Sequence, residues 1–151
     1  MNEYLELLRR PESVLIVVHT DDAYVLLLKR RAPFPFWQSV TGSLEINETY
    51  SEAALRELKE ETGLTNEGVL IDSNLYRRYK IDERWKDKYP KNIFYNTEYE
   101  FLYKVKQRVN ITKSTEHTDW CWVDIDFAIK KVWSLSNVEA LKKLRSNLKA
   151  S

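Results

Sequence analysis

Short apolar runs separated by turn-forming segments predict several strands in the first third of the chain. Residues 13–19 (SVLIVVH) are rich in β-branched side chains, which is typical of a buried strand. Residues 24–30 (YVLLLKR) follow two consecutive aspartates, a turn signal, so we expect them to be the hairpin partner of the first strand. Residues 37–42 (WQSVTG) predict a short strand that ends at a glycine, after a loop punctuated by prolines.

The pattern becomes helical between residues 50 and 62. Thr49 and Glu52 have the spacing of a capping box, and Gly63 lies where a helix commonly ends in a left-handed glycine. A second amphipathic helical region is expected from Ile125 to the end of the chain. The spacing that indicates it is that of Val138, Leu141, Leu144, Arg145 and Leu148.

The remaining segments complete a mixed architecture. Residues 69–72, 74–81, 93–105 and 119–124 have strand patterns, and residues 82–92 predict a charged loop. Strands interspersed with two or three helices predict an α/β (α+β) sandwich rather than a helix bundle or a β-barrel. No repeat, low-complexity segment or linker divides the sequence, so we expect a single domain over residues 1–151. The pattern leaves the role of residues 1–10 and the oligomeric state open.

Charge and cysteine content narrow the class of protein. Twenty-four basic and 23 acidic residues give a formal charge of +1, which argues against a dedicated binder of nucleic acid or acidic membranes. Cys121 is the single cysteine, so no intrachain disulfide forms, as suits a reducing cytosol. The apolar runs are too short to span a bilayer, and the N-terminus lacks a signal-peptide pattern. We therefore expect a cytoplasmic protein with neither nucleic-acid nor membrane partners.

The predicted helix at 50–62 carries three glutamates on one face. Glu57, Glu60 and Glu61 fall within about 60° of one another on a helical wheel, and such like-charge neighbours cost about 0.2–0.5 kcal/mol per pair. The apolar side chains occupy a separate sector: Ala54, Leu55 and Leu58. Lys59 projects elsewhere, so no counterion within the helix is expected for the carboxylates. A solvated face and a site for a divalent cation are both compatible with this geometry.

A longer spacing pattern resembles a known family. Gly42 is followed by five residues, Glu48, seven residues and then RELKEETGL at 56–64, which matches every fixed position of the 23-residue Nudix box. The resemblance implies a Nudix fold, with a mixed β-sheet sandwiched between α-helices and a loop–helix–loop that holds divalent metal. It also implies hydrolysis of a diphosphate attached to another moiety.

The same resemblance implies roles for the carboxylates of the box. Glu57, Glu60 and Glu61 would bind Mg²⁺, with Mn²⁺ as the alternative, and Glu61 or a carboxylate outside the box would activate water. Metal ions neutralise phosphate charge and lower the pKa of a bound water, which suits this chemistry.

The other box positions are implied to shape the loop. Glu48 and Arg56 would be structural partners that hold the loop against the helix, and Gly42 would let a backbone carbonyl approach the metal. Asn47 departs from the pattern, because many family members have glycine there. Asparagine tolerates the left-handed conformation better than most residues, so we expect the loop to be preserved.

The flanks of the box resemble one branch of the family. LLLKRRAPFPFWQSVTGSLE, NTE at 96–98, TEH at 115–117 and SLSNVEAL at 134–141 are similar to the dihydroneopterin triphosphate diphosphatases. That branch implies a small-molecule triphosphate substrate, which is cleaved to the monophosphate and pyrophosphate in folate synthesis. The alternatives are a nucleoside triphosphate such as dATP, or a sensor that binds a nucleotide without cleaving it. The complete set of box carboxylates argues against the sensor.

Five residues before the box are candidates for substrate binding. Arg30 and Arg31 are suited to phosphate, or are simply surface charges that end a strand. Trp37 either stacks on a planar ring, as its neighbour Phe36 could, or belongs to the core. Gln38 and Ser39 could hydrogen-bond a pterin edge, although alternation along a strand points about half of such side chains away.

Two residues before the last predicted strand add candidate chemistry. Glu116 is the candidate for an additional metal ligand or the general base, because of the resemblance to the branch. His117 could carry a proton near neutral pH, orient its neighbours, or be merely exposed. For the charged loop at 82–92, closure over the triphosphate and an ordinary mobile surface are both open.

Overall fold

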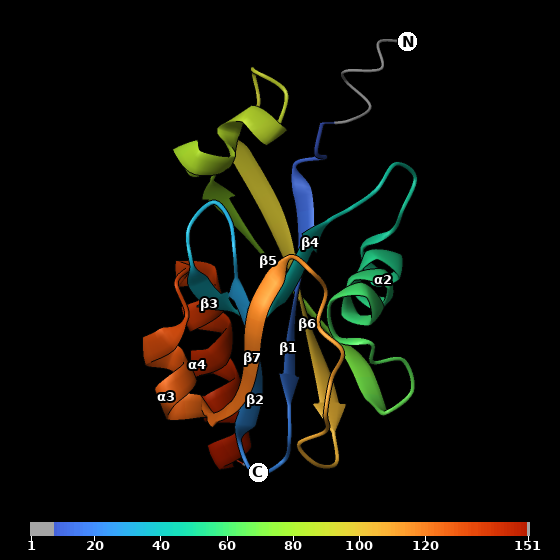
Figure 1. Cartoon of the computed structure of the whole chain (residues 1–151), viewed down its shortest axis with the longest axis vertical. Coiled ribbons are helices and arrows are strands. Elements are labelled where there is room, and N and C mark those ends of the chain that lie inside the picture. The colour runs from blue at the N-terminus through green and yellow to red at the C-terminus, as the bar shows by residue number, and fades with distance from the viewer. Residues whose placement is uncertain (1–7, 151) are drawn as a thin grey trace.

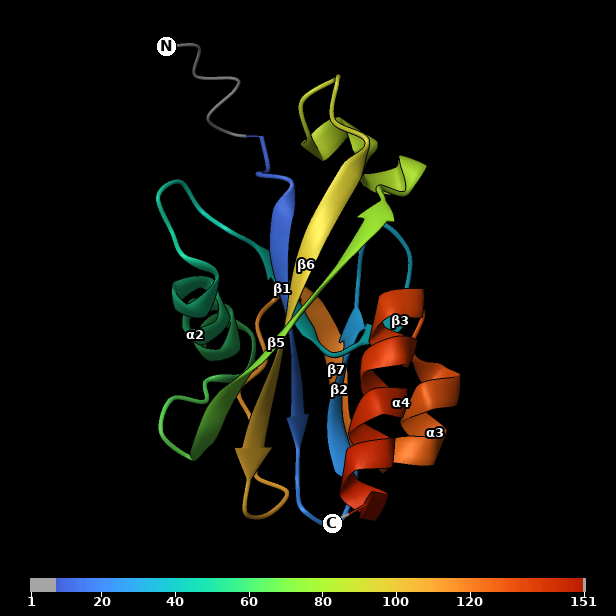
Figure 2. The same cartoon turned by 180° about the vertical axis from the view of Figure 1, so that it is seen from behind.

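The computed structural model of the protein describes residues 8–150, which form a mixed sheet between two helical layers (Figure 1). The strands are β1 (Glu12–His19), β2 (Tyr24–Arg30), β3 (Phe36–Gln38), β4 (Val40–Ser43), β5 (Gly68–Lys80), β6 (Tyr95–Val105) and β7 (His117–Asp124). The helices are α2 (Tyr50–Thr62), α3 (Ile125–Lys131) and α4 (Leu135–Ala150), with a short 3₁₀ helix, η1 (Glu83–Lys88). Helix α2 covers one face of the sheet and α3 and α4 cover the other (Figure 2). Of the N-terminal segment 1–10, the first seven residues lie outside the described part.

Strand β1 lies at the centre of the sheet, whose main order is β3-β2-β1-β6-β5. It runs parallel to β6 and antiparallel to β4. Val14 and Ile16 pack in the core beneath α2, whereas Leu15 and Val17 pack in the core beneath α3 and α4. A strand buried on both faces needs apolar residues at every position, which explains the unbroken run in its sequence.

The hairpin predicted for the first two strands is confirmed only near its turn. Strands β1 and β2 are antiparallel, but the pairing is limited to His19 with Val25. Beyond this point β1 pairs with β4 and β6, and β2 pairs with β3 and β7. The strands separate because each finds longer partners elsewhere in the chain.

The single strand predicted at 37–42 is wrong, because the chain changes partners at Ser39. Strand β3 pairs with β2, and β4 pairs with β1. Ser39 is fully buried between them, and its backbone N–H donates to Oδ1 of Asn137 over 2.8 Å. The amide Nδ2 of Asn137 donates in return to the Ser39 hydroxyl over 3.0 Å. A distant side chain therefore fixes a break that the local pattern does not signal.

Three further elements differ from their predicted form. The segments 69–72 and 74–81 are one strand, β5, with an irregularity where Asn74 has a φ of 54°. The expected loop 82–92 contains η1, which begins where the Asp82 side chain accepts from the N–H of Arg84. The helical region after residue 125 is two helices, interrupted where the Trp133 N–H donates to the carbonyl of Trp37 over 3.2 Å.

Helix α2 has the predicted boundaries. The two hydrogen bonds of the Thr49–Glu52 capping box are present, and Gly63 ends the helix with a φ of 77°. Ala54 and Leu58 are buried as predicted, but Leu55 is 52% exposed. It lies at the edge of the packed sector, because Ala53 occupies the inner position instead. Asn47 has a φ of 63°, so the loop before the helix uses the left-handed conformation that was expected of it.

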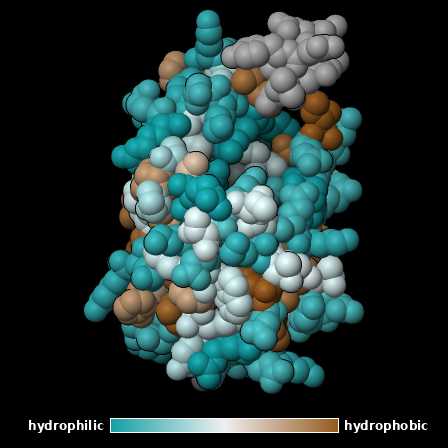
Figure 3. Space-filling model, viewed as in Figure 1, coloured by the Kyte–Doolittle hydropathy of each residue, from teal (hydrophilic) through white to brown (hydrophobic). Residues whose placement is uncertain are grey.

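Apolar side chains are concentrated in the two cores rather than on the outside. The face shown in Figure 3 is largely hydrophilic, with hydrophobic residues scattered over it. Within residues 8–150, no helix combines the length and apolar character needed to cross a membrane.

Candidate active site

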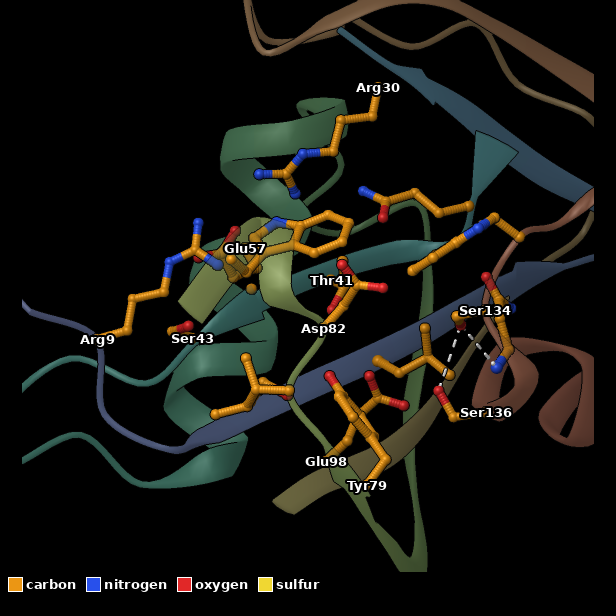
Figure 4. A pocket seen from close by; sticks show the side chains of 18 of the residues that line it. Arg9, Arg30, Thr41, Ser43, Glu57, Tyr79, Asp82, Glu98, Ser134 and Ser136 are labelled. Carbon is orange, nitrogen blue, oxygen red and sulfur yellow. Dashed lines mark hydrogen bonds between the residues drawn. The ribbon is translucent and has the colours of Figure 1, made fainter. Parts of the chain in front are cut away.

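A pocket of about 760 Å³ joins elements that are distant in the sequence. Its lining comes from β1, the end of β2, β3, β4, α2, the end of β5, η1, β6, the segment 133–137 and several connecting loops. Arg9, Arg30 and Glu57 lie on one side of this pocket, and Tyr79, Glu98, Ser134 and Ser136 lie on another (Figure 4).

Arg56 on α2 organises the loop that precedes the helix. Its Nε and Nη2 donate to the two carboxylate oxygens of Glu48 over 2.7 and 2.8 Å, in the two-pronged geometry that only a guanidinium provides. Nη2 also donates to the carbonyl of Ser43 over 3.0 Å. Nη1 donates to Glu57 over 2.7 Å and to Glu60 over 3.2 Å. The expectation that the helix supplies no counterion is therefore wrong, because Arg56 supplies one.

Glu57 is buried beside the backbone of β4. A Cβ added to Gly42 would lie 2.1 Å from the Glu57 carboxyl carbon, so only glycine leaves room for this carboxylate. Burial raises the pKa of Glu57 to about 7, with a contribution from Glu61 and Glu60 and opposition from Arg56. The contact with Arg56 therefore offsets only part of the cost of burying the negative charge of Glu57.

Glu61 is held by a different set of partners. Its Oε2 lies 2.6 Å from Nδ1 of His117 and accepts a hydrogen bond from the Ser114 hydroxyl over 3.1 Å. Burial alone would raise the pKa of Glu61, but His117 and Ser114 outweigh it and the pKa is lowered. His117 is itself buried, and its Nε2 faces Nε2 of Gln38 at 3.4 Å. His117 therefore orients Glu61, and the alternative that it is merely exposed is wrong.

Glu116 directly precedes β7, and its exposed side chain lines the same pocket. Its side chain interacts with Glu61, and its backbone carbonyl accepts from the N–H of Arg31 over 3.2 Å. Both carboxylates assigned to activating water, Glu61 and Glu116, are thus neighbours. Glu60 lines the pocket from an exposed position on α2.

The chemistry of these donors fits a hard divalent cation, because they are carboxylate oxygens together with the backbone of Gly42. Among residues 8–150, no three His, Cys, Asp or Glu side chains are grouped closely enough to hold an ion in their present positions. Glu57 contacts Arg56 instead, and Glu61 contacts His117. Arg56 and His117 therefore occupy oxygens of these two carboxylates in the present arrangement.

The candidate substrate residues separate into two groups. Arg30 and Gln38 line the pocket, and Arg30 is anchored by donation from its Nε to the carbonyl of Ala32 over 2.7 Å. Arg31, Trp37 and Ser39 are not among the lining residues. Trp37 packs in the core beneath α3 and α4 and lies under the ammonium group of Lys131, and Ser39 is buried against Asn137.

Phe36 reaches the pocket where Trp37 does not, because successive side chains of a strand point to opposite faces. Its ring centroid lies 5.9 Å from that of Trp85 on η1 and 5.3 Å from that of Trp133. The three rings form an aromatic wall. The charged loop 82–92 therefore contributes Trp85 to the pocket, a role that its composition did not indicate.

Comparison with known proteins agrees with this arrangement. The profile of the NUDIX domain matches residues 9–144. The chain belongs to the Nudix family. It is 39% identical over 142 residues to the dihydroneopterin triphosphate diphosphatase of Haemophilus influenzae, which covers 91% of this chain and 89% of that protein. The Escherichia coli enzyme of the same name is 35% identical, covering 92% of this chain and 95% of that protein.

Solved structures of Nudix proteins have the same fold. The structure of the E. coli dihydroneopterin triphosphate pyrophosphohydrolase matches with a TM-score of 0.87 and 34% identity, over 93% of this chain and 99% of that one. The family and the fold predicted from the box are confirmed, and the chain is a Nudix hydrolase, acting on phosphorus-containing anhydrides. Nudix hydrolases generally use divalent metal ions, in agreement with the donor set.

Sequence reasoning missed several lining residues. Tyr79 lies in β5, whose strand pattern indicated no role at a site, and Glu98 lies in the NTE fragment, for which the resemblance to the branch gave no role. Arg9 precedes the first strand and carries no motif, yet it lines the pocket and its N–H donates to the carbonyl of Lys88 over 2.7 Å. Only the arrangement of the strands in space shows that these residues line the pocket.

Proposed function

We propose that this Nudix hydrolase cleaves dihydroneopterin triphosphate to the monophosphate and pyrophosphate, with Mg²⁺ as its metal. The observation that supports this most strongly is one pocket that combines the box carboxylates with an aromatic wall able to contact a planar ring. The full-length similarity to two named dihydroneopterin triphosphate diphosphatases supports the same substrate.

Glu57, Glu60 and Glu61, with the backbone of Gly42, would hold the divalent ion. The bound ion would supply neutralisation of phosphate charge and a lower pKa for a bound water. Arg30 and Arg9 lie where their guanidinium groups can contact the triphosphate, which is the recognition for which this side chain is best suited.

Glu61 or Glu116 would take the proton from the attacking water. The water oxygen forms a bond to phosphorus, the bridge between the α and β phosphates breaks, and pyrophosphate leaves. His117 and Ser114 hold the Glu61 carboxylate, so its position is set before the substrate arrives.

The proposal predicts metal-dependent release of pyrophosphate and the pterin monophosphate, without orthophosphate. We would follow dihydroneopterin triphosphate by ³¹P NMR with Mg²⁺ and again with excess chelator, which should stop the reaction. Glu61→Gln should lower kcat by about 10²-fold or more, the contribution expected of a positioned base. Glu67→Gln is the matched control, because Glu67 is exposed and caps only its own loop.

Two results would contradict the proposal. One is no cleavage of dihydroneopterin triphosphate by a folded wild-type protein with Mg²⁺ or Mn²⁺. The other is release of orthophosphate as the first product. Near-full activity of Glu61→Gln would show that Glu61 is not the base, but it would not contradict the proposed substrate.

A further inference from the structure

Glu98 on β6 is a buried carboxylate that the reaction chemistry above does not use. It lines the pocket, is 5% exposed, and its Oε1 has no hydrogen-bond partner within the described part of the chain. A buried acceptor without a hydrogen bond lowers the stability of the fold. Its presence in a pocket indicates that a bound ligand donates the missing hydrogen bond.

The neighbours of Glu98 leave this oxygen open. The hydroxyls of Ser136 and Tyr79 interact with the carboxylate. The Tyr79 oxygen already accepts from Nδ2 of Asn96 over 3.0 Å, so its own hydrogen is free to point at Glu98. Burial raises the pKa of Glu98 to about 7, with opposition from Ser136, Arg77 and Tyr79 and a contribution from Glu100.

Arg77, whose charge acts on Glu98, makes its hydrogen bonds to other carboxylates. Arg77 donates to Glu100 over 3.0 Å through Nη1 and to Glu139 over 3.0 Å through Nε. Lys143 lies 3.4 Å from the other oxygen of Glu100. Glu100, the other buried carboxylate of β6, is therefore paired on both oxygens, whereas Glu98 lines the pocket with one unpaired oxygen.

The chemistry of this acceptor selects a class of ligand. A carboxylate that faces a planar ring accepts best from two adjacent N–H groups, as in other bidentate carboxylate pairs. The 2-amino-4-oxopyrimidine edge of a pterin or a guanine presents such a pair, the amino group and the neighbouring ring N–H. Adenine instead presents one amino group beside an acceptor nitrogen, which a carboxylate repels.

The position of Glu98 in the pocket is suited to a contact with the ring of the substrate. Figure 4 shows Glu98 beside Tyr79, apart from Arg9, Arg30 and Glu57. A substrate with its phosphates at the arginines and box carboxylates can therefore reach Glu98 with its ring. Leu15 and Phe36 line the same pocket and provide apolar surface for the ring faces.

We infer that Glu98 determines ring specificity, by accepting hydrogen bonds from the 2-amino group and adjacent ring N–H of a 2-amino-4-oxopyrimidine edge. The inference rests on the proposed function and adds to it the residue that distinguishes a pterin from adenine.

The test compares wild type with Glu98→Gln on dihydroneopterin triphosphate, dGTP and dATP. The carboxamide keeps the shape but turns an N–H₂ towards the ring donors. We expect kcat/KM to fall about 100-fold for the pterin and for dGTP, because a site built for polar partners rejects a mismatch strongly. For dATP, kcat/KM should stay within about threefold, because the amide can pair with adenine.

Binding of the free ring supplies a readout that needs no turnover. Neopterin, titrated by its own fluorescence without metal, should bind Glu98→Gln at least about tenfold more weakly than wild type. Glu100→Gln is the matched control on the same strand, since it does not line the pocket. It should lower the melting temperature without changing the ratio of pterin to dATP activity. Glu98→Asp keeps the charge but moves the carboxylate away from the ring, so its affinity for neopterin should lie between those of wild type and Glu98→Gln.

The outcomes separate this inference from the proposed function. Equal losses on all three substrates, or no loss on any, would overturn the role of Glu98, as would unchanged neopterin binding. Activity of wild type on dGTP but not on dihydroneopterin triphosphate, with the dGTP activity lost in Glu98→Gln, would remove the proposed substrate and support the reading of the ring edge.

Discussion

Gly42 and Gly63 illustrate how a missing side chain serves either chemistry or folding. Gly42 has an ordinary backbone conformation, and the space that its Cβ would fill holds the Glu57 carboxylate. Gly63 has a φ of +77°, and its added Cβ would meet nothing closer than Thr112 at 3.5 Å. Glycine is thus required at position 42 by the adjacent side chain of Glu57, and at position 63 by the left-handed backbone conformation.

The alanine variants of these glycines should therefore have opposite effects. Gly42→Ala displaces the flexible end of Glu57, so we expect kcat to fall at least about tenfold while the free energy of unfolding changes by under about 1 kcal/mol. Gly63→Ala forces alanine into the left-handed region, so we expect a loss of about 1–2 kcal/mol in stability with near-normal kcat. Urea titration and steady-state kinetics measure both quantities. A large loss of stability in Gly42→Ala with normal activity would contradict this assignment.

Single residues differ in how far the sequence reveals their roles. The spacing of Glu57, Glu60 and Glu61 identifies them because a helix places such neighbours on one face. The contact of Glu61 with His117 joins α2 to the start of β7, and no local pattern encodes such a contact. The NTE fragment includes Glu98, but alternation along β6 indicates only which side chains are buried and not that one of them borders a pocket.

At the scale of elements, the junction between β3 and β4 depends on α4. Asn137, near the start of α4, satisfies both the N–H and the hydroxyl of buried Ser39. The backbone N–H of Asn137 is held in turn by the Ser134 hydroxyl over 3.1 Å. This link positions Gln38 on one side of the break and Gly42 beyond it, so it connects the helix to both parts of the site.

Removing this link should destabilise the protein measurably. Asn137→Ala leaves the buried Ser39 N–H without its partner, and we expect the free energy of unfolding to fall by about 1–3 kcal/mol. Asn147→Ala is the matched control, because Asn147 is exposed on the same helix and its change should stay within about 0.5 kcal/mol. Denaturant unfolding of the two variants decides the matter. Equal free energies of unfolding of the two variants would show that the Ser39–Asn137 contact does not stabilise the protein.

Elements with strong local signals were predictable, and those defined by distant contacts were not. The ends of α2 are encoded by Thr49 and Gly63, which act within their own helix turn. The break at Ser39 and the interruption at Trp133 arise from partners about 98 and 96 residues away along the chain, and the apolar pattern passes through both without a signal.

At the scale of the whole molecule, the sheet brings the two parts of the pocket together. Strand β1 contributes Ser13 and Leu15, the box contributes its carboxylates from α2, and β6 contributes Glu98. The parallel pairing of β1 with β6 places Ser13 next to Glu98 on the neighbouring strand. The box predicts one part of this site and the overall fold, whereas the other part exists only after the strands have assembled.

The central claim is that this assembled pocket is specific for a pterin triphosphate. Its most direct test is kcat/KM of the wild-type protein on dihydroneopterin triphosphate against dATP, with Mg²⁺, under one set of conditions. We expect a ratio of at least about ten, equivalent to roughly 1.4 kcal/mol of differential transition-state binding. A ratio of one or below would contradict it and assign the pocket to nucleotides.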